Sequence, residues 1–177
     1  MRKSYVWLVI AAILLFTISA GVTVALLVSS SNTVVNTFTI GGVSISLGET
    51  TGDKYIMTPG VDVPKDPTVT VIANSESSWL FVKIEKENDF DLFCDYEIAD
   101  GWSLLDGYDD VFYRMVDKSV SDQIFSILKS NCIHIKDTLT EERLNAVANN
   151  PTLKFTAYAA QKDGVASVED AWKALNR

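Results

Sequence analysis

The sequence predicts a mainly β fold: a jelly-roll-type β-sandwich with a few short helices, preceded by an N-terminal signal or transmembrane helix. Three observations favour this class. Beyond residue 37, about eight short segments alternate apolar and polar residues, as strands with one buried face do. Asp-Gly pairs at 100–101, 106–107 and 163–164 separate several of them as turns. The strand faces carry enough apolar residues to fill the space between two sheets.

The N-terminus predicts export. Arg2 and Lys3 precede residues 6–28, a run without any charged residue. A basic start before an apolar run is typical of a signal peptide, and the run is also long enough to cross a bilayer, which needs about 20 residues. A small residue ends the Thr-Val-Ala sequence at Ala25, so we expect cleavage there. The alternative for residues 1–25 is a retained membrane anchor, and both alternatives place the rest of the chain outside.

Residues 26–37 form an uncharged, strand-prone stretch with no obvious partner in its own chain. An extended segment of this kind can complete the open edge of a sheet in a neighbouring subunit. We therefore expect residues 26–37 to be a candidate donor strand and residues 38–177 to be the folded domain. The apolar residues assigned to self-assembly are Leu26, Leu27, Val34, Val35 and Phe38.

The first predicted strand of the domain changes step at Gly41-Gly42. Its apolar positions are even as far as Ile40 and odd from Val43 onward. A one-residue slip would move every later side chain to the opposite face of a sheet. Two structures would resolve this: a β-bulge at the glycines, or a chain that crosses there from one sheet to the other.

The remaining elements follow in order along the chain. Alternation predicts further strands, among which residues 79–87 direct Leu80, Val82 and Ile84 to one face. Near the C-terminus, Ser167 precedes a stripe of apolar residues at helical spacing and predicts a helix start. A second helix is expected over 138–151, while 119–131 is compatible with helix or strand. The other predicted strands are 68–74, 110–116, 131–136 and 152–161.

The chain contains two cysteines, Cys94 and Cys132. Outside the cell such a pair can oxidise, so the two residues form a candidate disulfide. The alternative is two separate free thiols. The alternation of neighbouring residues does not decide between them.

The sequence supports no reaction. It has one histidine, His134, whereas catalytic zinc needs about three protein ligands, and no Gly-x-Ser-x-Gly or phosphate-binding motif occurs. Cys132 and His134 lack a third orienting group. The acidic segments 87–95 and 106–110 lack EF-hand spacing and are typical of solvated loops. We therefore expect no enzyme, no catalytic residue, no metal site and no cofactor.

Net charge limits the classes of binding partner. The chain carries 15 Lys and Arg against 23 Asp and Glu, a formal net charge of −8. Nucleic acids require a basic binding face, so we expect no nucleic-acid partner. Contact with a membrane is expected only through the N-terminal segment if that segment is not cleaved.

Segments spread over nearly the whole length resemble the TasA/camelysin family of secreted proteins from Gram-positive bacteria. The combination of "PG…KDPTVTV" with a final "AYAAQ…AW" is moderately specific. The segments that carry the resemblance are "NTFTIGGVSISL", "MTPGVDVPKDPTVTVIANSE", "LFVKIE", "ADGW", "VFYRMV" and "FTAYAAQKDG…EDAWKAL".

The resemblance implies a jelly-roll domain in the extracellular matrix or at the cell surface, with a leader cut by an ER-type signal peptidase. It also implies homo-oligomeric biofilm fibres, in which the N-terminal strand of one subunit inserts into the sheet of the next. The alternative is a membrane-tethered surface binding or adhesion module. Some family members are called metalloproteases, but the single histidine of this chain argues against that activity. The apolar sequence around Ala25 and the two cysteines depart from the family pattern.

Overall fold

The computed structural model describes residues 37–51, 57–140 and 151–176. These residues belong to one compact unit, which extends from Val35 to Arg177. The predicted signal or transmembrane helix, the cleavage position and most of the candidate donor strand lie outside the described residues. So does most of the helix expected over 138–151.

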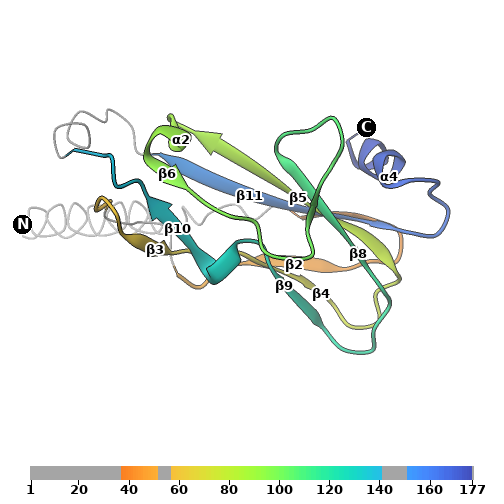
Figure 1. The fold of residues 1–177 in the computed structure, drawn as a ribbon. Helices are drawn as coiled ribbons and strands as arrows, with labels where there is room; N and C mark the ends of the chain where they lie inside the picture. The colour runs from red at the N-terminus through yellow and green to blue at the C-terminus, as the bar shows by residue number, and fades with distance from the viewer. Residues whose placement is uncertain (1–36, 52–56, 141–150, 177) are drawn as a thin grey trace, which may run out of the picture. The chain divides into compact units, whose positions relative to one another are not determined.

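The largest sheet has five strands in the order β1-β11-β5-β8-β7 (Figure 1). All neighbouring strands in it are antiparallel except β1 and β11, which run parallel. Its longest ladder joins β5 and β11 over their full ten residues. The strands of this sheet are β1 (Thr37–Ile40), β5 (Ser78–Glu87), β7 (Ser103–Leu104), β8 (Val111–Val116) and β11 (Thr152–Gln161).

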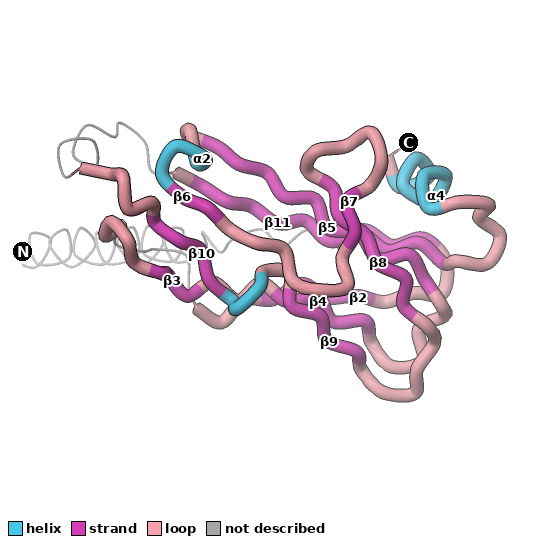
Figure 2. The backbone as a smooth tube through the Cα atoms, in the orientation of Figure 1, coloured by secondary structure: helices cyan, strands magenta, loops and turns pink. Residues whose placement is uncertain are grey.

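Two three-stranded sheets form a second layer (Figure 2). One has the order β2 (Ile45–Gly48), β4 (Thr68–Val71), β9 (Gln123–Ser126), and the other has the order β3 (Asp62–Pro64), β10 (Cys132–Ile135), β6 (Cys94–Asp95). Backbone hydrogen bonds continue the pairing across their junction, from Ile127 N–H to Pro67 C=O (3.0 Å) and from Lys65 N–H to Asn131 C=O (2.8 Å). A 3₁₀ turn at Lys129–Asn131 bends the chain between β9 and β10. The two small sheets therefore make one bent layer.

The chain crosses between the two layers at Gly41-Gly42. β1 belongs to the five-stranded sheet, and β2 belongs to the sheet with β4 and β9. Gly41 has φ +86°, and a Cβ at this position would lie 2.7 Å from Cβ of Gln161. Only glycine fits there, because it tolerates positive φ and leaves room for the close approach. The change of step in the sequence is thus a crossing between sheets, and the β-bulge alternative is wrong.

The main hydrophobic core lies between the two layers. Leu80, Val82 and Ile84 of β5 are buried in it, as the alternation of the sequence predicts. The facing layer contributes side chains from both small sheets, so this core holds all three sheets together. Other members are Val63, Val69, Val71, Ile133, Ile135, Ala157 and Ala159.

A second core covers the opposite face of the five-stranded sheet. Phe81 of β5 is also fully buried, although the sequence alternation assigns it to the exposed face. The reason is α4 (Val168–Leu175), whose Trp172 packs on Phe81 and Tyr158 with ring centroids 5.2 and 5.0 Å apart. Ser167 caps this helix, as predicted, by accepting a hydrogen bond from Asp170 N–H at 3.2 Å.

The protein is mainly β with a few short helices, as predicted. The ambiguous segment 119–131 contains β9 and the 3₁₀ turn. The sequence did not predict the short strands β3, β6 and β7 or the single-turn helix α2 (Phe90–Phe93). No helix within the described ranges is long and apolar enough to cross a membrane.

Replacing Trp172 by Ala tests whether α4 completes the fold. Trp172 is only 4 % exposed, and truncation of such a side chain costs about 3–5 kcal/mol. We expect the Trp172→Ala variant to lose this amount in urea unfolding. The exposed neighbour Lys173→Ala should change stability by less than about 0.5 kcal/mol. Equal unfolding midpoints for the two variants would contradict the role given to the second core.

Candidate functional site

The first candidate site is the outer edge of β11, next to β1. β11 pairs with β5 along its whole length but with β1 only from Ala157 to Ala160. Lys162 N–H donates to Ser77 C=O (2.8 Å), so in this antiparallel ladder the even-numbered residues of β11 bond to β5. The odd-numbered residues direct their backbone groups to the outer side.

Leu153 and Phe155 are therefore the residues whose N–H and C=O groups face outward beyond the end of β1. In the part of the chain that the structure describes, no residue pairs with these groups. Their side chains are half-buried and pack against the main core. We call the backbone of Leu153 and Phe155 the β11 edge. Among the described residues its two donors and two acceptors have no strand partner, which an added strand would supply.

The structure describes only one of the predicted assembly residues. Phe38 lies in β1, and its backbone is in register with Tyr158 of β11. Leu26, Leu27, Val34 and Val35 lie outside the described residues, as does Ala25. The sequence analysis found no strand within the chain that would pair with the N-terminal stretch. In the structure, β1 pairs with β11, the last strand of the same domain. Pairing between the first and last strands joins residues about 120 positions apart and leaves no local signal in the sequence.

The candidate disulfide is not formed in this structure, and both cysteines are free thiols. Cys94 on β6 stands opposite Ile135 of β10. Cys132 lies three residues from Ile135 on the same strand, roughly 10 Å further along, and points to the opposite face. A disulfide needs Cα atoms about 4.4–6.8 Å apart. The disulfide prediction is therefore wrong for this arrangement of strands.

The second candidate site is a shallow hollow of about 480 Å³ on the exposed face of β3, β10 and β6. Most of its charged groups are paired. His134 Nδ1 lies 2.7 Å from Asp62 Oδ1, and Lys129 Nζ lies 2.5 Å from Glu97 Oε2. The hollow is lined by Asp62, Asp95, Tyr96, Glu97, Lys129, Ser130, Cys132 and His134.

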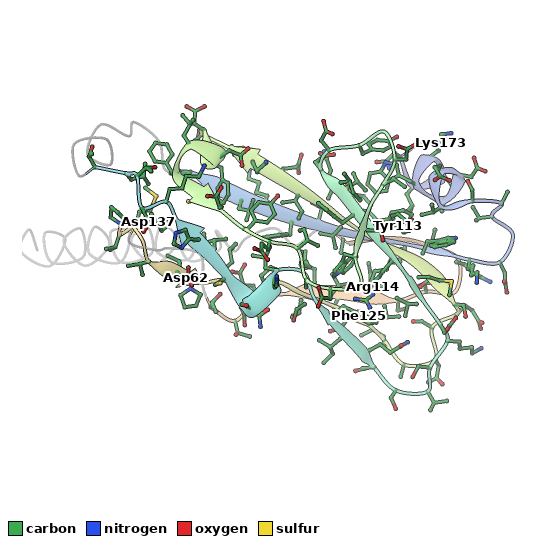
Figure 3. The ribbon with its side chains drawn as sticks, in the orientation of Figure 1. Asp62, Tyr113, Arg114, Phe125, Asp137 and Lys173 are labelled. Carbon is green, nitrogen blue, oxygen red and sulfur yellow. The ribbon has the colours of Figure 1, made fainter. Side chains whose placement is uncertain are left out.

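His134 stands between two carboxylates that the sequence analysis did not connect with it. Asp62 comes from β3, and Asp137, whose Oδ2 lies 3.6 Å from His134 Nε2, follows β10; both are labelled in Figure 3. The hydrogen bond to Asp62 raises the pKa of His134, and the charge of Asp137 adds to this. A histidine surrounded in this way links β3 to the end of β10 most strongly when it is protonated.

Cys132 is not arranged as a nucleophile. Asp62 supplies the orienting group that a Cys-His pair requires. However, the Cys132 thiol makes a 4.0 Å contact with Lys129 C=O, and desolvation raises its pKa. Both effects favour the thiol over the reactive thiolate. Burial also raises the pKa of Cys94, to about 11.

Comparisons with known proteins identify no relative. No protein-family model, curated protein or solved structure matches this chain. The resemblance to the TasA/camelysin family therefore depends on the sequence segments alone. Within the described ranges, no three His, Cys, Asp or Glu residues are grouped to hold a metal ion.

Thiol labelling tests the separation of the cysteines. In the native protein we expect a maleimide to modify Cys132 slowly and to leave the buried Cys94 unmodified. Denaturation without reductant should expose both thiols, and Cys132→Ser should abolish the native reaction. Protection of both thiols in denaturant, with a mass lower by two hydrogens, would instead demonstrate a disulfide.

The stability contribution of His134 should depend on pH. Its folded-state pKa is raised, so the folded protein holds this proton more tightly than the unfolded chain does. The contribution is complete below the ordinary value of about 6.5 and is lost as pH rises through the raised value. We expect the Tm of the native protein to exceed that of His134→Gln most at about pH 5.5 and to match it near pH 8.5. A Tm difference that is constant over this range would contradict the effect.

Proposed function

We propose that this protein is a structural protein, secreted or held in the cell envelope, that self-associates into extracellular matrix fibres by N-terminal strand donation. The observation that carries the proposal is the β11 edge, which lies directly beyond the end of β1. The leader-like N-terminus and the uncharged stretch that follows it support export and strand donation. The proposal assigns no catalytic activity and no cofactor to the protein.

The register of β1 defines how a donor strand would dock. Thr37 is in register with Ala157, and Ile40 with Ala160, in a parallel pair. Continued toward the N-terminus, this register would set Val35 opposite Phe155 and Val34 opposite Lys154. A parallel strand there would satisfy the backbone groups of Leu153 and Phe155. The neutral residues of the 26–37 stretch suit such an edge.

A second copy can supply this strand because it carries the same sequence. Exchange of an identical element between subunits replaces intramolecular contacts with equal intermolecular ones, at little cost in free energy. Each subunit would then donate one strand and accept another, and this head-to-tail contact extends into a fibre when it does not close. Removal of the leader after Ala25 by a signal peptidase would free the donor strand.

We also propose that the fold is a jelly-roll-type sandwich. The two layers enclose one core, and the chain moves between them at Gly41-Gly42 and again between β4 and β5. Such crossings are typical of jelly rolls. The sequence segments that resemble the TasA/camelysin family support the same fold, and the proposed matrix role follows from that resemblance.

A membrane-tethered surface module is the second candidate, favoured by the uncharged run at 6–28. Mass spectrometry of the native protein distinguishes the two candidates. A mature N-terminus close to Leu26 supports the fibre subunit, whereas a retained leader supports the tether.

Deletion of residues 26–37 should abolish fibres seen by negative-stain microscopy and leave a folded, soluble domain. Thermal unfolding checks the fold of the variant. If the deleted form is folded and makes fibres as readily as the mature protein, strand donation from this segment is excluded.

A matched pair of variants tests the register. The register predicts that Val35→Asp places a charge at the inner face beside Phe155, where an unpaired charge costs several kcal/mol. Val34→Asp would stand beside Lys154 on the other face and should be tolerated, as should Ser30→Asp. We expect Val35→Asp to raise the critical concentration for fibre growth at least about tenfold over Val34→Asp. Equal critical concentrations for the two would exclude this register.

A further inference from the structure

Arg114 occupies an unusual position in the fold. It lies on β8 and is the one arginine among the residues that the structure describes. Its guanidinium carbon is 3.9 Å from the ring centroid of Phe125 and 5.4 Å from that of Trp102. Figure 3 shows Arg114 of β8 close to Phe125 of β9, and these two strands belong to different layers. The two aromatic rings pack against the guanidinium.

Arg114 makes no ion pair with any residue that the structure describes. Its Nε is buried and has no hydrogen-bond partner. The ion pairs found in the structure are made by lysines and His134. Arg114 is thus a partly buried cation without an anion among those residues.

Such an arrangement carries a cost that a ligand would remove. Burial of a charged group without an opposite charge is unfavourable, and here burial lowers the pKa of Arg114. The aromatic rings offset part of this cost through cation–π contacts. The N–H donors still need an acceptor, since an unmade hydrogen bond to a charged group is expensive.

Gly101 lies close to the terminal nitrogens of Arg114. It has φ +86°, and a Cβ added there would come within 3.0 Å of Nη2 and 3.5 Å of Nη1. A side chain at Gly101 would therefore crowd the guanidinium. A planar carboxylate can accept two parallel hydrogen bonds from such an arginine.

We propose that Arg114, held between Trp102 and Phe125, binds the carboxylate of an Asp or Glu side chain from a second copy of this protein. The second copy is favoured by charge, since the chain carries 23 acidic against 15 basic residues. Asp106 and Asp109 are exposed and make no ion pair with any described residue. This source rests on the self-association proposed above.

The surroundings of Arg114 also suit a protein partner. Leu104 of β7, which pairs with Phe112 two residues from Arg114, is 52 % exposed, and an arginine among aromatic and aliphatic residues is typical of protein–protein interface centres. An acidic sugar would instead need free aromatic faces for stacking, and the guanidinium lies against the faces of Trp102 and Phe125.

Arginine-selective ¹⁵N labelling of the secreted protein allows a direct test. We expect the Nε–H resonance of Arg114, assigned with Arg114→Lys, to move as the protein concentration rises through self-association. A titration with acetate at low protein concentration probes a carboxylate from any other source. Movement with protein concentration supports the proposal. If the resonance moves only with acetate, the second copy is refuted as the source of the carboxylate. If the resonance moves in neither titration, the site itself is refuted.

Two variants that each remove one positive charge distinguish the Arg114 contact from strand donation. Arg114→Gln should weaken self-association at least about tenfold, whereas Lys173→Gln on α4, which lies away from Arg114 in Figure 3, should leave it unchanged. Thermal unfolding checks that both variants are folded. If the folded Arg114→Gln protein associates like Lys173→Gln, the Arg114 site is excluded and strand donation is unaffected. If deletion of residues 26–37 leaves fibres intact while Arg114→Gln weakens them, strand donation fails and the Arg114 site stands.

Discussion

The ladder between β5 and β11 is the constraint on which the rest of the structure depends. It joins ten residues on each strand, and β5 buries apolar side chains on both of its faces. Leu80 faces the core between the layers, while Phe81 faces the core under α4. A central strand buried on both sides couples the two cores, because neither can open without exposing residues of the same strand.

That ladder also decides where the two proposed assembly surfaces lie. Because β11 gives one side to β5, its other side is available only to β1 and to whatever strand extends β1. On the opposite flank, β8 pairs with β5 and with the two-residue strand β7. On this flank Arg114 of β8 packs against the rings of Trp102 and Phe125. The two proposed assembly surfaces are thus on opposite flanks of one sheet, as a head-to-tail fibre requires.

Much of the fold was predictable from local patterns, and the candidate sites were much less so. Alternating apolar and polar residues predicted β5, β8, β10 and β11, and the Ser167 cap predicted α4. Both signals depend only on residues that are neighbours in the sequence. The burial of Phe81 was missed, since it depends on a helix about 90 residues away in sequence. The disulfide prediction was wrong for a related reason. Whether Cys94 and Cys132 meet is decided by the register of β6 on β10, which neither segment encodes alone.

By itself, the sequence determined the leader-like start, the mainly β class, the acidic balance and the need for a change of step at Gly41-Gly42. Only the tertiary structure decided that this step is a crossing between layers, that β1 lies parallel to the last strand, and that Arg114 lacks a partner among the described residues. The physical reason is the distance along the chain between the segments that interact. Strand pairing and charge pairing in a β protein join segments far apart in the chain, and such contacts are specified by the packing of the whole domain rather than by any single segment.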